Sequence, residues 1–260
     1  MKKFIKYSII LILILAQLTL AAAAWDNSSS WYIKRRGNDT PIFPPDAENL
    51  TCLDVYYIDK KASEKGDKII YLTFDAGYEN GNISKILDTL NNKNIPAAFF
   101  ILDNLIYKNP ELIQRMINDG HQICNHTCKH KNHSESDKAE IEEDLKRLEC
   151  LYRDRFGAEM EKFFRFPEGS YTRDAIEAVK DIGYSTVFWS FGYEDWDNSN
   201  QPSADYAINK IISNTHPGEI LLLHPTSDTN AKILPTLIDR WREMGYSFGT
   251  LNELKARNTE

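Results

Sequence analysis

The chain has 260 residues and a formal net charge of −7 at pH 7, from 31 basic and 38 acidic side chains. This acidic balance argues against nucleic acid or an anionic lipid surface as a partner, because both repel a negatively charged protein. Apolar residues make up 42% and aromatic residues 12% of the sequence, which excludes a disordered chain and predicts a hydrophobic core. The length suits one large α/β domain or two small ones.

The first 24 residues have the order of a secretory signal peptide. Lys2, Lys3 and Lys6 form a basic start, an apolar run follows, and Ala21–Ala24 provide the small side chains of a cleavage site. The sequence therefore predicts an extracytoplasmic protein, with residues 1–24 as a signal peptide or an uncleaved membrane anchor. Contact with a membrane is expected only through that segment. Its loss would make the remaining chain more acidic, because it holds basic residues and no acids.

Four cysteines would meet oxidising conditions outside the cytoplasm, where disulfides form. They are Cys52, Cys124, Cys128 and Cys150. Four are too few to staple a chain of this length, and their pairing cannot be deduced from sequence. Partly buried free thiols are the alternative.

Residues 25–68 are polar and rich in turn formers, which predicts an extended arm or linker lying against the domain. From residue 69 to about residue 255, short apolar runs alternate with segments of helical spacing. Residues 256–260 are expected to form a tail. The apolar runs have strand length and cover residues 69–74, 97–102, 122–124, 163–166, 184–189, 220–223 and 246–250.

Between these runs, apolar residues recur at intervals of three and four, as from Ile83 to Leu90, which predicts amphipathic helices. Three of the helices end at a glycine directly before a strand, at Gly120, Gly183 and Gly245. Strand, helix, glycine and strand in repetition indicate parallel βα units. The sequence therefore predicts a single-domain α/β fold, a distorted (β/α)7 barrel of parallel strands preceded by the arm.

Polar side chains stand where the predicted strands end, and parallel barrels place their active sites at those ends. Each has an ordinary structural explanation as well: Asp75 as a helix cap, Arg165 as an ion-pair residue and His224 as a buried core residue. All of them falling at strand ends favours a single site. In chain order they are Asp75, His126, His130, Arg165, Glu194, Asp195, Trp196 and His224.

His126 and His130 are four residues apart. On a helical turn this spacing would place both imidazoles on one face, about 6 Å apart, where they can hold one cation. The spacing alone is a weak signal, and a catalytic metal takes about three protein ligands. The third ligand stays open, with His133, Cys124 and Cys128 as neighbours. Zinc is the expected metal, and cobalt, nickel and manganese are alternatives.

Five motifs in order resemble those of the polysaccharide deacetylases of the NodB-homology type, carbohydrate esterase family four. The resemblance spans about residues 69–254, nearly the whole domain. It implies a metal-dependent hydrolase that removes N-acetyl groups from polysaccharides. The motifs are Thr73–Gly77, His126–His130, Arg165–Gly169, Asp195–Trp196 and Leu222–His224.

The resemblance also implies a role for each motif residue. A general base oriented by a guanidinium and a general acid tuned by a carboxylate are expected, which are Asp75 with Arg165 and His224 with Asp195. The implied metal ligands are His126 and His130. The implied substrate contacts are Tyr78, Trp196 and Leu222.

Within that family the chain is most similar to the delta-lactam-biosynthetic de-N-acetylases of peptidoglycan, in stretches such as Gly77–Gly81, Phe188–Ser190 and His216–Gly218. The similarity implies deacetylation of N-acetylmuramic acid that lacks its peptide, followed by muramic-δ-lactam formation in spore cortex. The implied partner is a peptidoglycan glycan strand, and a monomer is expected. An N-acetylglucosamine or chitooligosaccharide deacetylase and a non-catalytic wall-binding homologue remain as alternatives.

One position departs from the wider family, which has two aspartates in the first motif, the second being a metal ligand. Here that position is Ala76, which cannot coordinate a metal. In the delta-lactam branch the position is commonly not aspartate, so the change fits the resemblance. It leaves His126 and His130 as ligands and predicts weaker or more labile metal binding, with water, substrate or another side chain completing the shell.

Overall fold

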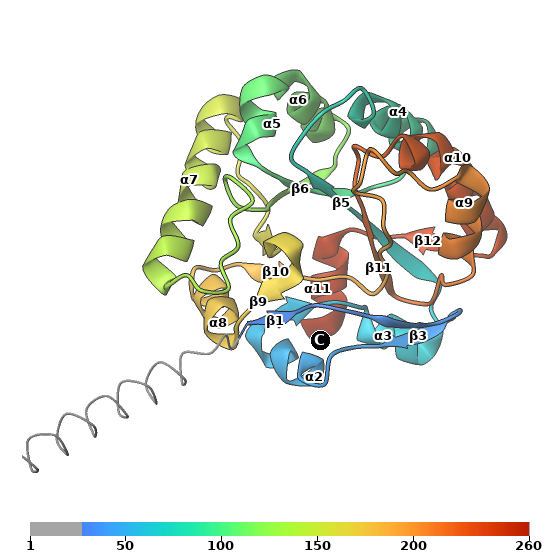
Figure 1. Ribbon diagram of the computed structural model, residues 1–260, viewed down its shortest axis with the longest axis horizontal. Coiled ribbons are helices and arrows are strands. Elements are labelled where there is room, and N and C mark those ends of the chain that lie inside the picture. The colour runs from blue at the N-terminus through green and yellow to red at the C-terminus, as the bar shows by residue number, and fades with distance from the viewer. Residues whose placement is uncertain (1–27, 260) are drawn as a thin grey trace, which may run out of the picture.

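The computed structural model describes residues 28–259, so the predicted signal segment 1–24 lies outside the described residues. None of the described helices is both long and apolar enough to cross a membrane. Figure 1 shows helices arranged around a central set of strands, with the N-terminal segment along one side and the last helix near the middle of the view.

All seven predicted strands are present in one parallel sheet, although two of them, β8 and β12, are only two residues long. The sheet runs in the order β11, β5, β6, β7, β8, β10 and β4, and β12 pairs with the first residues of β5. A bridge from Phe191 to Leu221 joins the chain after β10 to β11, which completes the predicted distorted barrel. The strands are β4 (Val55–Tyr56), β5 (Ile69–Ala76), β6 (Ala98–Ile101), β7 (Gln122–Asn125), β8 (Phe163–Phe164), β10 (Ser185–Val187), β11 (Glu219–Leu223) and β12 (Ser247–Phe248).

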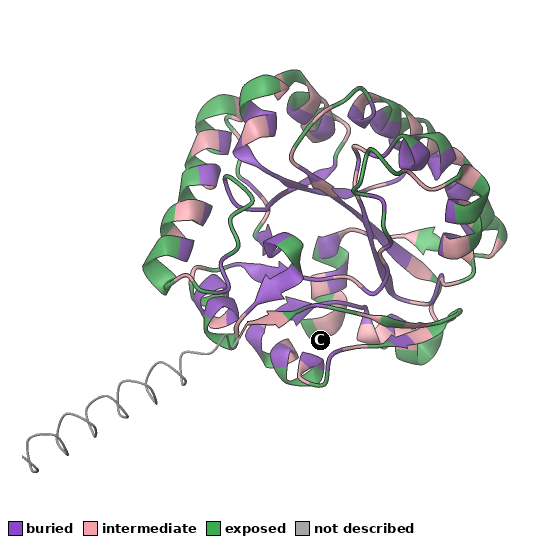
Figure 2. Ribbon diagram, in the orientation of Figure 1, coloured by how far each residue is buried: buried purple, intermediate pink, exposed green. Residues whose placement is uncertain are grey.

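Side chains along each strand alternate between the barrel interior and the layer beneath the helices. On β5, Leu72 and Phe74 belong to the large cluster shared with the helices, whereas Tyr71 belongs to the interior cluster. Figure 2 shows buried strands at the centre of the molecule, and helices around them that carry exposed residues on their outer side. The alternation places Asp75 on the interior side, at the carboxyl end of its strand.

The helices begin and end where side chains and glycines satisfy their free backbone groups. The side chain of Thr172 caps its helix by accepting the Ala175 N–H, and similar caps begin four other helices. Two helices end directly before Gly183 and Gly245, whose φ values of 94° and 85° suit glycine. The helices of the barrel are α4 (Ile83–Lys93), α5 (Asp103–Lys108), α6 (Pro110–Asn118), α7 (Lys138–Phe156), α8 (Arg173–Asp181), α9 (Ala204–Ile212), α10 (Asp228–Glu243) and α11 (Leu251–Thr259).

The N-terminal segment carries elements that its polar sequence does not predict. Val55 and Tyr56 form β4, which pairs in parallel with β10 and extends the sheet. Trp31 stacks on Phe188 with ring centroids 4.5 Å apart, so the segment packs firmly on the barrel. Its other elements are β1 (Ser29–Ser30), β2 (Lys34–Arg36), β3 (Asp39–Ile42), α2 (Ala47–Leu50), the short 3-10 helix η1 (Thr51–Leu53) and α3 (Lys60–Lys65); η2 (Pro167–Gly169) and β9 (Ser170–Tyr171) follow β8.

The chain end is helical where a tail is predicted. Helix α11 continues through residues 256–259, because its apolar side chains Leu251 and Leu254 pack in the barrel's interior cluster. Arg257 then anchors the last turn, with Nε 2.8 Å from Asp59 and Nη2 2.7 Å from Asp67. The prediction of a tail is therefore corrected over these residues.

Candidate active site

Four of the predicted site residues lie at the carboxyl ends of four different strands. Asp75 is the penultimate residue of β5, and His126 directly follows β7. Arg165 directly follows β8, and His224 directly follows β11. Because the carboxyl ends of parallel strands share one rim, segments that are distant in the chain contribute to one site.

Arg165 is fully buried and binds Asp75 from within the barrel. Its Nη1 donates to Asp75 Oδ1 over 2.8 Å, and its Nη2 donates to Thr73 Oγ1 over 2.9 Å. Its Nε donates to the Val187 carbonyl over 2.9 Å, which fixes the plane of the guanidinium. Burial alone would raise the pKa of Asp75, but the charges of Arg165, His126 and His224 and the Arg165 hydrogen bond together outweigh it and lower that pKa below its usual value. Asp75 is thus held as a carboxylate.

His126 is buried beside this ion pair. Its Nδ1 lies 2.8 Å from the Arg165 carbonyl oxygen, which can only accept, so Nδ1 carries the proton. Its Nε2 keeps a lone pair and lies 3.5 Å from Asp75 Oδ2. Burial lowers the pKa of His126 to about 4, although the charge of Asp75 opposes this. The ring is therefore neutral near pH 7, in the form that binds metals.

The loop from His126 to His130 is not helical, which corrects the geometry assumed from the four-residue spacing. Thr127 and His130 have left-handed φ values of 72° and 58°. The two imidazoles nevertheless lie close, with ring centroids 5.0 Å apart and planes at 75°. The backbone leaves the helical path because it is tied to neighbouring helices, for example by the Asp103 N–H, which donates to the Cys128 carbonyl over 3.1 Å.

The three neighbours considered as a third ligand are engaged elsewhere. His133 is fully buried, and its Nε2 lies 2.7 Å from Asp144 Oδ2. Cys124 is part of the interior cluster of the barrel. The Cys128 thiol lies 3.5 Å from the Asp144 carbonyl. All four cysteines are free thiols.

His224 is paired with Asp195. Its Nδ1 lies 2.7 Å from Asp195 Oδ1, and its backbone N–H donates to Oδ2 over 2.8 Å. Burial would lower the pKa of His224, but the charge of Asp195 and the hydrogen bond to it raise that pKa above its usual value. The charge of Asp75 adds to this shift, so the acid and the base influence each other across the site. The protonated form of His224 is therefore favoured, and Nε2 is the ring nitrogen that Asp195 does not engage.

The three predicted substrate contacts occupy different surroundings. Trp196 is 59% exposed, and its ring meets His224 edge to face with centroids 6.1 Å apart. Leu222 is buried at the end of β11, two residues before His224. Tyr78 is 60% exposed and makes no hydrogen bond or ring contact among residues 28–259. The structure thus joins Trp196 and Leu222 to the catalytic set and leaves Tyr78 at the surface.

The donor set suits a divalent cation bound by two protein ligands. A histidine that donates one nitrogen to a carbonyl and leaves the other free, as His126 does, has the arrangement of metal-bound histidines. The separation of its ring from that of His130 suits two imidazoles sharing one ion at about 2.1 Å from each nitrogen. Ala76 is fully buried and supplies no donor. Over residues 28–259, no three side chains of the His, Cys, Asp and Glu types are arranged to hold a metal ion together.

Two polar residues that hold the site escape prediction from the sequence. Asn230, in the first turn of α10, donates to the His224 carbonyl over 3.1 Å and to the carboxylate paired with that histidine. Thr73 accepts the hydrogen bond from Arg165. Its position two residues before Asp75, on the same strand face, is a signal that could have identified it. Asn230 carries no comparable signal, because only the fold brings its helix to this rim.

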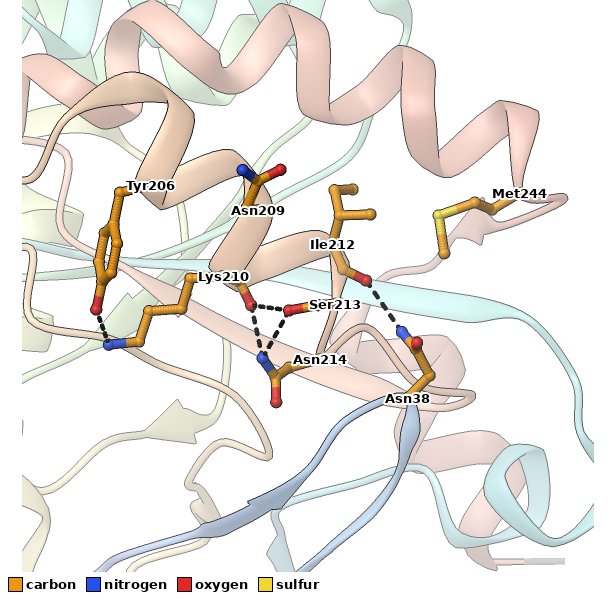
Figure 3. Close-up of a pocket in the computed structure, with 8 residues that line it drawn as sticks. All are labelled: Asn38, Tyr206, Asn209, Lys210, Ile212, Ser213, Asn214 and Met244. Carbon is orange, nitrogen blue, oxygen red and sulfur yellow. Dashed lines mark hydrogen bonds between the residues drawn. The ribbon is translucent and has the colours of Figure 1, made fainter.

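A cavity of about 580 Å³ lies beside the C-terminal end of α9 (Figure 3), and none of the predicted site residues lines it. Asn38, in the turn between β2 and β3, donates to the carbonyls of Ile212 and Thr215 over 3.0 and 2.8 Å. Lys210 donates to the Tyr206 hydroxyl over 2.8 Å. The two bonds from Asn38 join the N-terminal hairpin to the barrel, which gives the cavity a structural explanation.

Comparison with known proteins points to the family of hydrolases that the sequence motifs resemble. The family model for polysaccharide deacetylases matches residues 62–187. The chain is 34% identical over 239 residues to the peptidoglycan-N-acetylmuramic acid deacetylase PdaA of Bacillus subtilis, covering 90% of this chain and 88% of that protein. It is also 33% identical over 201 residues to a peptidoglycan-N-acetylglucosamine deacetylase of Bacillus cereus, covering 72% of this chain and 88% of that protein.

The fold agrees as well. The solved structure of Bacillus subtilis PdaA, a family 4 carbohydrate esterase, matches with a TM-score of 0.84 and 31% identity, covering 90% of this chain and 99% of that one. The relative and its solved structure each match 90% of this chain. The chain therefore belongs to the polysaccharide deacetylases, the hydrolases of carbohydrate esterase family four.

Proposed function

We propose that this protein removes the acetyl group from N-acetylmuramic acid units of peptidoglycan that lack their peptide, which leads to muramic-δ-lactam in spore cortex. The observation that carries the chemistry is one rim where Asp75 pairs with Arg165 and His224 pairs with Asp195, which supports a carboxylate base beside an imidazole acid. The name of the Bacillus subtilis relative, an N-acetylmuramic acid deacetylase, supports the muramic substrate.

The first half of the reaction needs a base. Asp75 takes a proton from the attacking water as the water oxygen bonds to the acetyl carbonyl carbon. Arg165 helps to keep this carboxylate ionised and orients it through the hydrogen bond from Nη1, while Nη2 donates to Thr73 and fixes the guanidinium. A divalent cation held by His126 and His130, with zinc proposed and cobalt, nickel or manganese as alternatives, would polarise the acetyl oxygen and lower the pKa of water.

The second half needs an acid, because an amine departs poorly without a proton. As the carbon–nitrogen bond breaks, His224 gives its Nε2 proton to the leaving nitrogen, and the products are acetate and a free amino sugar. Asp195 stabilises the imidazolium before that transfer. Trp196 and Leu222 form the apolar wall of the site, and we assign the exposed Tyr78 to the sugar chain beyond it.

The same proposal places the protein outside the cytoplasm, secreted to the cell wall or anchored at the outer membrane face, with a peptidoglycan glycan strand as its partner. The signal-like segment 1–24 supports export. The acidic chain meets an anionic wall polymer through a few local cations rather than through its overall charge. We expect it to act as a monomer.

The test is acetate release from peptide-free glycan strands by the zinc-loaded protein, with the products analysed by mass spectrometry. Acetate together with muramic-δ-lactam fragments is the expected result, and the His224→Ala variant should release almost none. Acetate only from N-acetylglucosamine oligomers would favour the second candidate, a glucosamine deacetylase, which the Bacillus cereus relative's name supports. No acetate from any N-acetylated glycan would favour a non-catalytic wall-binding protein.

A further inference from the structure

The loop that carries both proposed metal ligands adopts a strained backbone. Thr127, a β-branched residue, has a φ of 72°, and His130 has a φ of 58°. Residues with side chains avoid this region, at about 1–2 kcal/mol each. Such a conformation persists only where the surrounding structure holds it, so the contacts of the loop determine where the two imidazoles lie.

Asp144 on α7 holds this loop at two points. Its Oδ1 accepts the Cys128 N–H over 3.0 Å, in the middle of the loop. Its Oδ2 lies 2.7 Å from Nε2 of His133, three residues beyond His130. His133 is fully buried, and its other nitrogen lies 3.0 Å from Ser136 Oγ, so the ring cannot turn freely. One carboxylate therefore ties the centre and the exit of the loop to a long helix.

Other contacts hold the entry and the opposite side. Asn125 Oδ1 accepts the Thr127 N–H over 2.9 Å, where the chain leaves β7. Lys129 Nζ lies 3.0 Å from Asp103 at the start of α5, but its side chain is 67% exposed, so that contact is weakened by solvent. The Asp144 side chain is only 14% exposed, so its bonds are the stronger tie between the loop and a neighbouring helix.

We propose that Asp144 is a positioning residue that sets the separation of His126 and His130, and through it the affinity of the site for a divalent cation. The inference rests on the proposed function, because it takes these histidines as the metal ligands. Ala76 makes the loop's rigidity decisive. No third ligand on β5 retains the ion. Any displacement of one imidazole therefore lowers the affinity of the site for the cation directly.

Zinc titration of the metal-free full chain tests this proposal. Asp144→Ala is expected to raise the zinc Kd about 10–100-fold, the range for losing a supporting partner of a metal site. The visible spectrum of bound cobalt should change as well, because the geometry at the ion alters. Asp154→Ala removes an exposed carboxylate from the same helix and should leave the zinc Kd within about two-fold.

A second, milder variant keeps the proposal testable if Asp144→Ala does not fold. Asp144→Asn keeps the shape and can still accept the Cys128 N–H, so we expect a smaller rise, about ten-fold. Circular dichroism and thermal unfolding of the metal-free variants establish that each is folded, and if Asp144→Ala does not fold, the Asn variant decides. Folded variants that bind zinc as tightly as the unmutated protein, with the same cobalt spectrum, overturn the proposal.

The same titration separates this inference from the proposed function. If the unmutated protein binds zinc but releases no acetate, the proposed function fails while the role of Asp144 is still decided by the Kd values. If the unmutated protein binds neither zinc nor cobalt, the assigned ligands are wrong and the inference fails with them.

Discussion

Strand β11 has a histidine and a carboxylic acid at each end, and the two pairs differ in charge. At the carboxyl end, His224 Nδ1 lies 2.7 Å from Asp195 Oδ1. At the amino end, His216 and Glu219 are both buried, yet His216 Nδ1 donates to the Asn214 carbonyl over 2.9 Å and lies 3.7 Å from the Glu219 oxygen. The same residue types thus form an ion pair on the rim and a neutral pair beneath it.

The difference follows from the donors around each carboxyl group. Asp195 accepts from the ring and backbone of His224 and from Asn230. Glu219 accepts one hydrogen bond, from the His216 N–H over 3.1 Å, and its Oε1 has no partner among the described residues. Burial raises the pKa of Glu219 to about 8, and burial lowers the pKa of His216 to about 4. Proximity of an acid and a base is therefore insufficient for catalysis without donors that stabilise the charge.

The largest expected effect comes from Asp195→Asn, which removes the charge from the rim pair and preserves its shape. We expect kcat to fall about 10²–10⁴-fold, the contribution of one general acid. The raised pKa of His224 keeps the acid protonated to higher pH, so the alkaline limb of the kcat/KM profile should move to lower pH in the variant. Acetate release measured from about pH 5 to pH 10 checks both expectations.

Glu219→Gln supplies the matched control at the other end of the strand. Its acetate release at neutral pH should stay within about two-fold of the unmutated rate, because no charge is lost near the substrate. Comparable losses of kcat in the two variants would contradict the distinction between the pairs.

The next effect concerns Arg165, whose positive charge helps to keep Asp75 ionised. Arg165→Met leaves Asp75 partly buried without its partner, which should reduce the free energy of unfolding by about 3–5 kcal/mol. It should also move the acid limb of the pH profile to higher pH, because the pKa of Asp75 is no longer lowered by the guanidinium. Urea unfolding and the pH profile measure the two changes.

Arg165→Lys is the control for this variant, because it retains the charge and loses the planar fork. It should shift the acid limb less than Arg165→Met does. An unchanged acid limb in both variants would show that Asp75 does not depend on the arginine.

Much of the fold could be predicted because local patterns carry it. The run from Ile69 to Phe74 and the glycine at Gly183 signal a strand and a helix end without reference to the rest of the chain. The short strand of Val55 and Tyr56 could not be predicted in this way. It is two residues long within a polar segment, and it becomes a strand through its pairing with β10.

The sequence predicts side chains that the fold brings to one rim, but it does not predict their charges. His216 and His224 both flank the apolar run of β11, and neither position alone tells a core histidine from a catalytic one. Sequence proximity even suggests the wrong pair, because Glu219 is three residues from His216, whereas Asp195 is 29 residues from His224. Whether an imidazole is charged depends on donors such as Asn230, which the fold brings in from elsewhere.

The buried pair of His216 and Glu219 should affect how the free energy of unfolding depends on pH. Folding raises the pKa of Glu219 from 4.5 to about 8, so the folded protein keeps a proton that the unfolded chain releases. Its stabilising contribution is complete below pH 4.5 and is lost as the pH rises towards 8, at about 1.4 kcal/mol per unit. Between about pH 6.5 and pH 8, the free energy of unfolding measured in urea should therefore fall less in Glu219→Gln than in the unmutated protein, by about 2 kcal/mol. Parallel pH dependence in the two proteins would show that Glu219 is ionised when folded.

The smallest effect concerns exposure, the remaining difference between the two ends of β11. The side chain of His224 is 25% exposed and meets the Trp196 ring edge to face, whereas the side chain of His216 is only 2% exposed. Trp196→Ala removes a wall of the site and leaves the ion pair intact, so KM should rise about 2–10-fold with kcat nearly unchanged. Trp196→Phe should restore much of the lost affinity, because it keeps an aromatic face against the sugar. A fall in kcat at constant KM would instead mean that the indole acts on the proton transfer, and His224 would then need Trp196 as well as Asp195 to work as the acid.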